Sequence, residues 1–457
     1  MLTGYWVKGV AVILRSSPEK RAPRVRKHLS ADAMHSLLRL RFEKIPDHRG
    51  RKCPISLTDA LMSAFGMFSL KDPSLLAFEE RRNDENMRNL FGIARVPSDT
   101  HMREILDPVE PRQLRPVFNA VFRQLQRGKA LEPFVFHQGC YLLSLDGTGF
   151  FSSSAIHCES CLEKVNKQTQ EVTYQHQMLA AVITHPSHRE VIPLAPEPIV
   201  KQDGIEKNDC ERNAAKRLLR QIRQEHPHLK LIVVEDGLAS NAPHIRELKA
   251  LNMHFILGAK PGDHSFLFDE VLAAWEKDRV TSIRWTEGEI SCEIAFINDI
   301  PLNESNQDLR VNWLCYAEYG PNGEERKWTW VTDLQISRQN ARRLVQGGRC
   351  RWKIENETFN TLKNQGYRLE HNYGHGKKNL SVVFAMLMML AFLVDQVQQF
   401  CCPLFQAALK KMETKRALWD NLRSHFRHFV FRSMRQLYHV MLYDLAKKLP
   451  APILNTC

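Results

Sequence analysis

The chain has 457 residues, of which 43% are hydrophobic and 25% charged, as in ordinary folded proteins. This composition excludes a disulfide-stapled miniprotein, a collagen-like chain and a largely disordered one, and the length predicts about three domains. Lys and Arg outnumber Asp and Glu by 64 to 51, a net charge of +13, which indicates a polyanionic partner, with nucleic acid as the first candidate.

Residues 1–135 are predicted to form a helical, basic DNA-binding region. The apolar start, Gly4 to Leu14, is interrupted by Lys8 and lacks a cleavage site, so we expect a disordered or optional extension and not a signal peptide. Basic residues dominate from Arg15 to Lys52. Apolar residues then recur at helical spacing from Leu57 to Leu125.

Residues 136–265 change from helical spacing to short apolar runs typical of buried strands. The predicted order is β-β-β-α-β-α-β, a mixed sheet in which the first three strands and the fourth lie in the order 3-2-1-4, so that strands one and four are parallel neighbours. The expected strands are Cys140 to Leu145, Met178 to Ile183, Glu190 to Leu194, Leu229 to Val234 and Phe255 to Leu257, and the expected helices are Asn208 to Glu225 and Ala242 to Leu251.

The remaining chain is predicted in three parts. Residues 266–335 alternate in the manner of an antiparallel β insertion. Residues 336–400 form the second part of the core, with a helix from about Arg338 to Leu362 and a buried helix through Val382 to Val394, which is too short to cross a bilayer. Residues 401–457 form a basic helical region with one long helix, residues 404–449.

Two carboxylates stand where apolar strands run into turns. Asp146 follows the first strand and Asp236 the fourth, each before a glycine. Asp-Gly is a common turn dipeptide, so each step alone has a purely structural reason. If the two strands are parallel neighbours, however, the carboxylates adjoin and need a cation between them, and Mg²⁺ prefers such oxygen ligands.

A third acid is expected from the helix that follows the insertion. Glu355 lies one helical turn after Arg351, an arrangement that a surface ion pair also explains. Glu357 is an alternative to Glu355 as the third acid, although the spacing from Arg351 favours Glu355.

In these segments the chain resembles the DDE transposases of bacterial insertion sequences, in the branch with an RNase H-like core and a β-strand insertion before the catalytic Glu. The family signature is Tyr, two residues, Arg, three residues, Glu, six residues, Lys; here Gly348 stands at the Tyr position and Lys363 is one residue late. The motifs that carry the resemblance are Leu145 to Thr148, Lys207 to Glu211, Glu235 to Gly237 and Arg351 to Lys363.

The resemblance implies an α/β fold with helical N- and C-terminal regions. It implies that Asp146, Asp236 and Glu355 form a catalytic triad holding two Mg²⁺ ions, with Mn²⁺ as a possible substitute. The activity implied is cleavage at the ends of an insertion sequence and transfer of the freed 3′-hydroxyl into target DNA. Cations expected to contact DNA are Arg349, Arg351, Lys353 and Lys363.

The partners implied are terminal inverted repeats and target DNA, bound by a homodimer, with no membrane. The 11 cysteines, mostly scattered, are typical of a reduced cytoplasmic protein. Two alternatives stay open: an RNase H-like nuclease without strand transfer, and an inactive DNA-binding regulator derived from a transposase.

One cysteine motif lies outside this scheme. Cys158 and Cys161 form a Cys-x-x-Cys, which is half of a zinc site, and either His176 or Cys210 is a candidate to complete it. The loop His371 to Gly376 has the composition of a metal or phosphate loop, though DNA contact or an ordered turn explains it as well.

Overall fold

The computed structural model describes residues 3–7, 10–14, 27–50, 53–201 and 210–443. The chain divides into two compact units, each made of separate stretches of sequence. Unit 1 comprises Met1–Leu131, Phe150–His176 and Asn360–Cys457, and unit 2 comprises Glu132–Gly149 and Gln177–Phe359.

Several predicted features lie outside the described residues. These are residues 15–26 and 51–52 of the basic run, the first three residues of the family motif at residues 207–209, and the end of the last predicted helix, residues 444–449.

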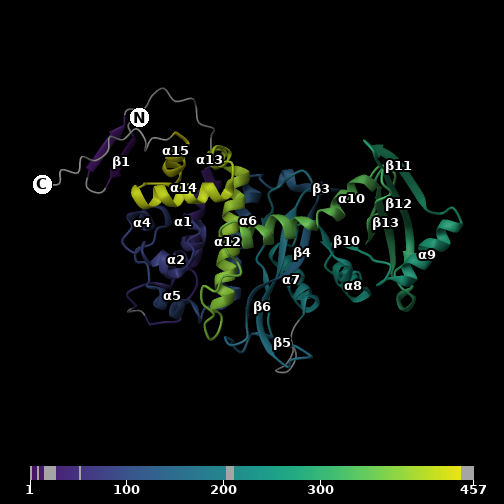
Figure 1. Cartoon of the computed structure of the whole chain (residues 1–457), viewed down its shortest axis with the longest axis horizontal. Helices are drawn as coiled ribbons and strands as arrows, with labels where there is room; N and C mark the ends of the chain where they lie inside the picture. Colours follow the sequence, from purple (N-terminus) through teal and green to yellow (C-terminus); the bar gives the residue numbers. More distant parts are fainter. Residues whose placement is uncertain (1–2, 8–9, 15–26, 51–52, 202–209, 444–457) are drawn as a thin grey trace. The chain divides into compact units, whose positions relative to one another are not determined.

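Unit 1 is mainly helical (Figure 1). Its centre is α12, which packs along α2, and both helices are buried over nearly their whole length. Within the described part of the chain, α12 is the single helix long and apolar enough to cross a membrane, and all of its most apolar stretch is buried in protein, as predicted for residues 382–394. The helices are α1 (Ala31–Phe42), α2 (Leu57–Leu70), α3 (Leu75–Glu79), α4 (Glu85–Phe91), α5 (Asp99–Leu106), α6 (Arg115–Arg127), α11 (Asn360–Asn364), α12 (Leu380–Cys401), α13 (Pro403–Met412), α14 (Lys415–His428) and α15 (Met434–Tyr443).

The two ends of unit 1 correct the sequence prediction. The apolar start was predicted to be disordered or optional, but within it β1 (Thr3–Val7) pairs antiparallel with β2 (Val10–Leu14). The single long C-terminal helix is also wrong: α13, α14 and α15 replace it. Glu413 has φ +62°, outside the helical region, and Thr414 caps the start of α14 by accepting from the Ala417 amide.

Unit 2 contains the predicted mixed sheet. Neighbouring strands follow the order β10-β9-β4-β6, and the short strands β7 and β8 pair antiparallel with β6. This confirms the predicted order 3-2-1-4 and the RNase H-like fold class. The elements are β3 (Val135–His137), β4 (Cys140–Ser153), β6 (Val172–Thr184), β7 (Ile192–Pro193), β8 (Glu197–Ile199), α7 (Glu211–Glu225), β9 (Leu231–Glu235), α8 (Ala242–Ala250) and β10 (His254–Gly258).

The boundary between the units falls within β4 and within β6. In unit 1 the first residues of β6 pair with β5 (Leu162–Val165), a hairpin that the sequence prediction missed. Its outer residues are mostly exposed and polar, so it lacks the apolar run by which the other strands were found.

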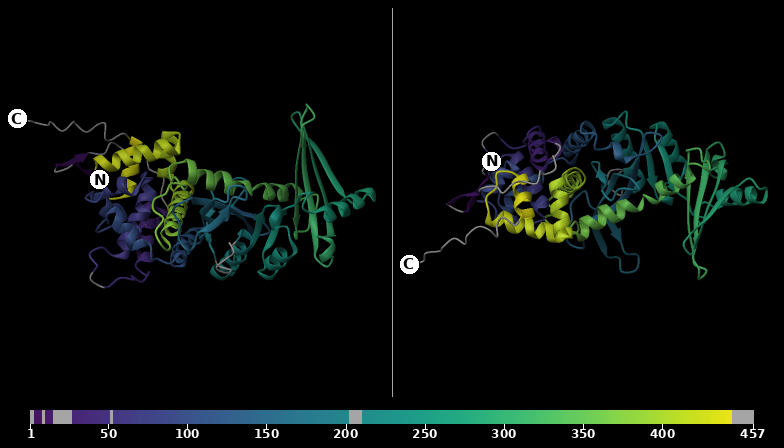
Figure 2. Two further views of the ribbon diagram at one scale, coloured as in Figure 1. Left: turned by 60° about the horizontal axis from the view of Figure 1, so that its bottom comes forward. Right: turned by 90° about the horizontal axis from the view of Figure 1, so that it is seen from above.

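The β insertion is present but is not a separate sheet. Its four strands pair antiparallel in chain order, and β14 then pairs antiparallel with β10 of the core. Figure 2 shows these long strands at one end of the core sheet, with α9 beside them. The elements are α9 (Ser265–Glu276), not predicted, and β11 (Thr281–Glu287), β12 (Ile290–Pro301), β13 (Arg310–Tyr319) and β14 (Glu325–Thr332).

The helix predicted from residue 338 to residue 362 is interrupted. It consists of α10 (Ala341–Arg349), a turn, and the π-helical segment η6 (Ile354–Phe359). Two glycines let α10 approach the sheet: a Cβ at Gly347 would lie 2.9 Å from the Phe136 ring, and one at Gly348 would lie 2.5 Å from the indole of Trp330. Packing on the sheet therefore fixes the end of α10, and the wider π turn carries the acidic residues that follow.

Candidate functional site

Asp146 and Asp236 come from the neighbouring parallel strands β4 and β9 of unit 2. The register pairs Ser144 with Val234, and each aspartate stands two residues further along the chain, Asp146 on β4 and Asp236 directly after the end of β9. The carboxyl ends of parallel strands meet at the same edge of a sheet, so the predicted juxtaposition follows from the strand order. Both aspartates line one pocket of about 260 Å³.

Glu355 joins this group through Arg351. One guanidinium nitrogen, Nη1, donates to Glu355 Oε1 at 2.6 Å and lies 3.4 Å from Asp146 Oδ2. Arg351 is therefore not a surface partner of Glu355 alone, because it bridges two of the three predicted acids. The Arg351 side chain is only 17% exposed, so these charges interact in a partly desolvated setting.

The electrostatics of Asp146 are those of a carboxylate held among other acids. Burial raises the pKa of Asp146 to about 7; Arg351 opposes this rise, and the charges of Glu355 and Glu211 add to it. A carboxyl group in this state takes up a proton near neutral pH unless a cation replaces that proton. The cluster of oxygen donors is thus chemically suited to a hard divalent cation.

Glu211, the first residue of α7, is a fourth acid of this site that we did not single out from the sequence. It lines the pocket shared by Asp146 and Asp236, and its Oε1 lies 2.1 Å from where a Cβ on Gly147 would be. Glycine after Asp146 therefore lets this carboxylate lie against the strand. Burial, together with Asp236 and Glu235, raises the pKa of Glu211. The signal in the sequence was its place in the Lys207 to Glu211 motif.

Glu235 and Asp236 are adjacent but do different things. Glu235 is buried and accepts from His244 Nε2 at 2.6 Å. Burial disfavours the imidazolium, but the ion pair with Glu235 outweighs this effect and raises the pKa of His244. Asp236 is exposed and accepts from the Leu238 amide. Both acids line the pocket, but Glu235 is paired with His244, whereas among the described residues Asp236 is paired only with a backbone amide of its own turn.

The structure also separates Glu355 from its alternative. Glu357 lies on the same π-helical segment but pairs with Arg189 at 3.2 Å. Glu355 pairs with Arg351, which contacts Asp146. The geometry therefore groups Glu355 with the aspartates.

The other predicted DNA-contacting cations have partners within the protein. Arg349 pairs with Glu318 at 3.1 Å and lies over the Trp328 ring. Lys353 donates to the backbone carbonyl of His188. In unit 1, Lys363 pairs with Glu370 at 2.8 Å.

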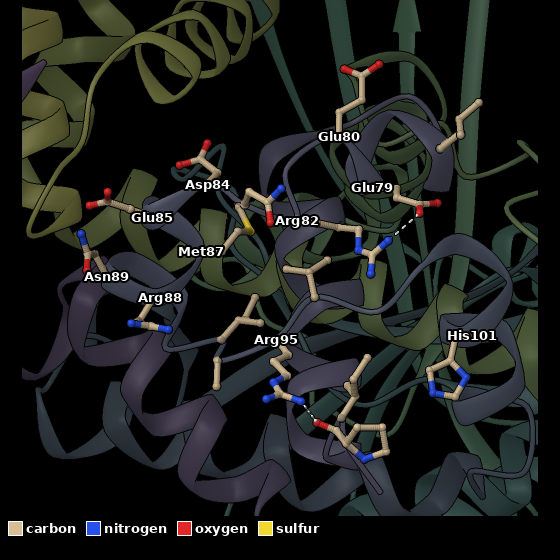
Figure 3. A pocket seen from close by; sticks show the side chains of 17 residues that line it. Glu79, Glu80, Arg82, Asp84, Glu85, Met87, Arg88, Asn89, Arg95 and His101 are labelled. Atoms are coloured by element: carbon tan, nitrogen blue, oxygen red, sulfur yellow. Dashed lines mark hydrogen bonds and ion pairs between the residues drawn. The ribbon is translucent and has the colours of Figure 1, made fainter. Parts of the chain in front are cut away.

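A larger pocket in unit 1, of about 1220 Å³, has a different character (Figure 3). Its charged lining mixes Arg82, Arg88 and Arg95 with the four acids Glu79, Glu80, Asp84 and Glu85. The Arg82 guanidinium pairs with Glu79 at 3.2 Å, and Arg95 donates to a backbone carbonyl. A phosphate finds no excess of positive charge there, so this pocket supplies no argument for DNA binding.

Comparison with protein families supplies the identification. A model described as the transposase DDE domain matches residues 152–393, more than half of the chain. The chain belongs to the DDE transposase family. It is therefore a DNA transposase, an enzyme that breaks and rejoins phosphodiester bonds. The match includes Asp236 and Glu355 and begins six residues after Asp146, so the place of Asp146 in the site comes from the geometry.

Two further comparisons add less. Among solved structures, the synaptic complex of piggyBac transposase with hairpin DNA covers 94% of this chain and 82% of that chain, with 11% identity and a TM-score of 0.38. That likeness is too weak to define the fold, which rests on the strand order. No curated protein matches the chain.

The structure explains one departure of this transposase from the family signature. Gly348 stands where the signature has Tyr, and its Cα faces the indole of Trp330 so closely that no side chain fits without displacement. Trp330, on β14, occupies the space beside α10 that a larger residue at position 348 would need. Close packing of α10 against the insertion strand β14 therefore explains why this chain has glycine, and not tyrosine, at position 348.

Proposed function

We propose that Asp146, Asp236 and Glu355 hold two Mg²⁺ ions and catalyse cleavage at the ends of an insertion sequence, followed by strand transfer. The observation that carries this proposal is the bridge from Asp146 through Arg351 to Glu355, together with the pocket shared by Asp146 and Asp236. Asp146 and Asp236 share a pocket at the sheet edge, and Arg351 links Asp146 to Glu355, so three acids far apart in sequence are grouped around Asp146. This grouping supports a two-metal phosphoryl-transfer site.

The donor set fits such ions. Burial raises the pKa of Asp146 to about 7, so a cation at this carboxylate would replace the proton that burial favours. Bound divalent cations would lower the pKa of the attacking hydroxyl group and neutralise the leaving oxygen, and Mn²⁺ is an acceptable substitute. Glu211, which lines the same pocket, would supply a further oxygen ligand to such a cation.

Basic residues near the carboxylates position the acidic side chains and offset their negative charge. Arg351 holds Asp146 and Glu355 at a common point before cations enter; with cations present its guanidinium is free to bind a substrate phosphate in bidentate fashion. Arg349, Lys353 and Lys363 bind DNA only by giving up or sharing their protein partners. We therefore assign them secondary roles in affinity.

The partners proposed are terminal inverted repeats and target DNA. Joining requires two ends to be brought together, so we propose a homodimer on DNA. We propose a cytoplasmic location, because the substrate is DNA and the 11 cysteines are mostly scattered along the chain.

The test uses the purified full chain, Mg²⁺ and DNA carrying both ends of the element with its genomic flanks. The wild type is expected to nick at the ends and to join them to a target plasmid, and Asp146→Asn is expected to do neither. End cutting without joining would favour the nuclease alternative. DNA binding without Mg²⁺-dependent cutting, or cutting that survives in Asp146→Asn, would overturn the proposal.

A further inference from the structure

Unit 1 contains a second convergent cluster, built from soft ligands. Cys158 and Cys161 lie in the turn before β5, His176 lies on β6, and His375 lies in the loop before α12. One potential ligand atom from each residue lies within 4.8 Å of all the others. The sequence pointed to Cys158, Cys161 and His176, but the fourth member is His375 and not Cys210.

The distances within this cluster are those of a tetrahedral zinc site. With Zn–S near 2.3 Å and Zn–N near 2.05 Å, a regular tetrahedron has edges of about 3.8 Å between sulfurs, about 3.6 Å between sulfur and nitrogen and about 3.3 Å between nitrogens. The Sγ atoms of Cys158 and Cys161 are 3.8 Å apart, and the Nε2 atoms of His176 and His375 are 3.2 Å apart. Three sulfur–nitrogen distances fit as well. His176 Nε2 lies 3.5 Å from Cys158 Sγ and 3.4 Å from Cys161 Sγ, and His375 Nε2 lies 3.3 Å from Cys161 Sγ.

The surroundings orient the same four atoms. The Cys158 amide lies 3.4 Å from Cys161 Sγ, so a backbone N–H points at one sulfur, as it would toward a thiolate. His375 Nδ1 contacts the Gly376 carbonyl at 2.9 Å, which fixes the tautomer with the Nε2 lone pair facing the cluster.

Neither a disulfide nor a metal-free buried cluster fits these four residues as well as zinc does. A disulfide has sulfurs about 2.05 Å apart, much closer than the 3.8 Å seen here. Cys161, His176 and His375 are 1%, 1% and 6% exposed, and His176 Nδ1 has no hydrogen-bond partner among the described residues. Burying such groups without compensation is costly, and a metal ion provides that compensation.

We propose that Cys158, Cys161, His176 and His375 bind one Zn²⁺ ion and that this site is structural. Four protein ligands complete a tetrahedral shell and leave no position for substrate, which distinguishes it from a catalytic zinc site. The ion would join the β5–β6 hairpin to the loop that precedes α12, segments separated by about two hundred residues of sequence. This proposal is independent of the role of the carboxylates.

The zinc ion would fix the conformation of the loop that carries His375. Gly374 and Gly376 adopt φ of +145° and +71°, conformations that allow the chain to turn sharply on both sides of His375. Beyond it, the Asp107 carboxylate accepts from the four successive amides of residues 377–380 and so caps α12. Asp107 holds one end of this loop, and the zinc ion would hold the other.

The first test measures metal in the wild-type full chain, purified without chelators or a polyhistidine tag. Elemental analysis is expected to give one zinc per folded chain, and X-ray absorption is expected to give two sulfur and two nitrogen neighbours. Folded protein with zinc well below one per chain after growth with added zinc, or a shell without sulfur, would overturn the proposal.

The second test uses variants. Cys161→Ser and His375→Asn are expected to lose at least tenfold in zinc affinity, whereas Cys210→Ser, a matched change at an exposed cysteine, keeps full zinc content. If the first two fail to fold, Cys158→His keeps four ligands and is expected to retain zinc with one sulfur neighbour fewer. Full zinc content in both Cys161→Ser and His375→Asn would place the metal elsewhere and refute the site.

Discussion

The two side-chain clusters of this transposase illustrate two ways to bring ligands together. In unit 2, hard carboxylate oxygens converge at a sheet edge, remain partly exposed and share an arginine. In unit 1, thiols and imidazoles converge in a buried tetrahedron. Ligand softness and accessibility thus predict an exchangeable Mg²⁺ site that performs chemistry and a closed Zn²⁺ site that stabilises the fold.

The clusters also differ in their cost to the folded state. Asp146 sits among acids, and burial raises its pKa to about 7, so the charged site is destabilising until cations arrive. Arg351 lowers this cost only in part. The Cys and His atoms, in contrast, already stand at the spacing of a metal shell.

The largest expected effect is the loss of DNA cleavage when one carboxylate of the unit 2 cluster is removed. Glu355→Gln is expected to reduce Mg²⁺-dependent end cleavage by about 10³-fold or more, about 4 kcal/mol of transition-state stabilisation, because a metal ligand is lost. Glu357→Gln, two residues away and paired with Arg189, is the control and is expected to stay within a few-fold of wild type. Gel assays of end cleavage measure both, and equal losses in the two variants would contradict the assignment.

Metal removal compares the two clusters directly. Stripping zinc with a strong chelator is expected to lower the free energy of unfolding by several kcal/mol, on the order of 4, because the ion binds the folded chain far more tightly than the unfolded one. Omitting Mg²⁺ is expected to abolish cleavage and to lower the melting temperature of zinc-loaded protein by much less than zinc removal does, because the exchangeable ions bind more weakly. Calorimetry with each metal removed in turn checks this, and an unchanged transition after proven zinc loss would contradict it.

A smaller effect, about 1–3 kcal/mol, follows from the pKa of Asp146. Without divalent cations, Asp146→Asn is expected to be more stable than wild type at pH 8. The folded-state pKa is raised to about 7 from an ordinary value of 3.8, so the wild type loses stability as pH rises between about 4 and 7, and Asn does not titrate.

Denaturant unfolding at pH 4, 6 and 8 measures this difference. It is expected to be small at pH 4 and to reach its full size above pH 7. Saturating Mg²⁺ is expected to reverse it, since only the wild type keeps all three ligands. A difference independent of pH would show that Asp146 is not the titrating group.

The smallest effect concerns the cations near the carboxylates. Arg349→Ala is expected to change the slope of log affinity for DNA against log salt by less than about 1, because Arg349 already pairs with Glu318 and stacks on Trp328. Binding titrations at several salt concentrations test this. The control is Arg326→Ala, which removes an exposed arginine on β14, the strand paired with the Glu318 strand β13. A full unit of slope lost in Arg349→Ala alone would show that it leaves Glu318 to bind phosphate.

The sequence by itself was enough to predict the strands that carry Asp146 and Asp236, their order in the sheet and the resemblance to DDE transposases. Apolar periodicity and β-branched runs are local signals, and the order of strands and helices limits how a sheet is assembled. The catalytic roles of Asp146, Asp236 and Glu355 stay predictions. The β5–β6 hairpin was missed because the residues of β5 are mostly exposed and polar. The prediction also missed α9, although its buried residues Leu267, Val271 and Ala274 recur at helical spacing.

Tertiary structure alone decided which groups meet. Arg351 bridges Asp146 and Glu355, Glu211 lies against Gly147, and His375 completes the set begun by Cys158 and Cys161. In each case at least one partner comes from a distant part of the chain, and its approach depends on strand register, on the close packing of α10 and on the path of an irregular loop. Local sequence fixes the conformation of short segments, whereas distances between distant side chains come from the packing of the whole fold.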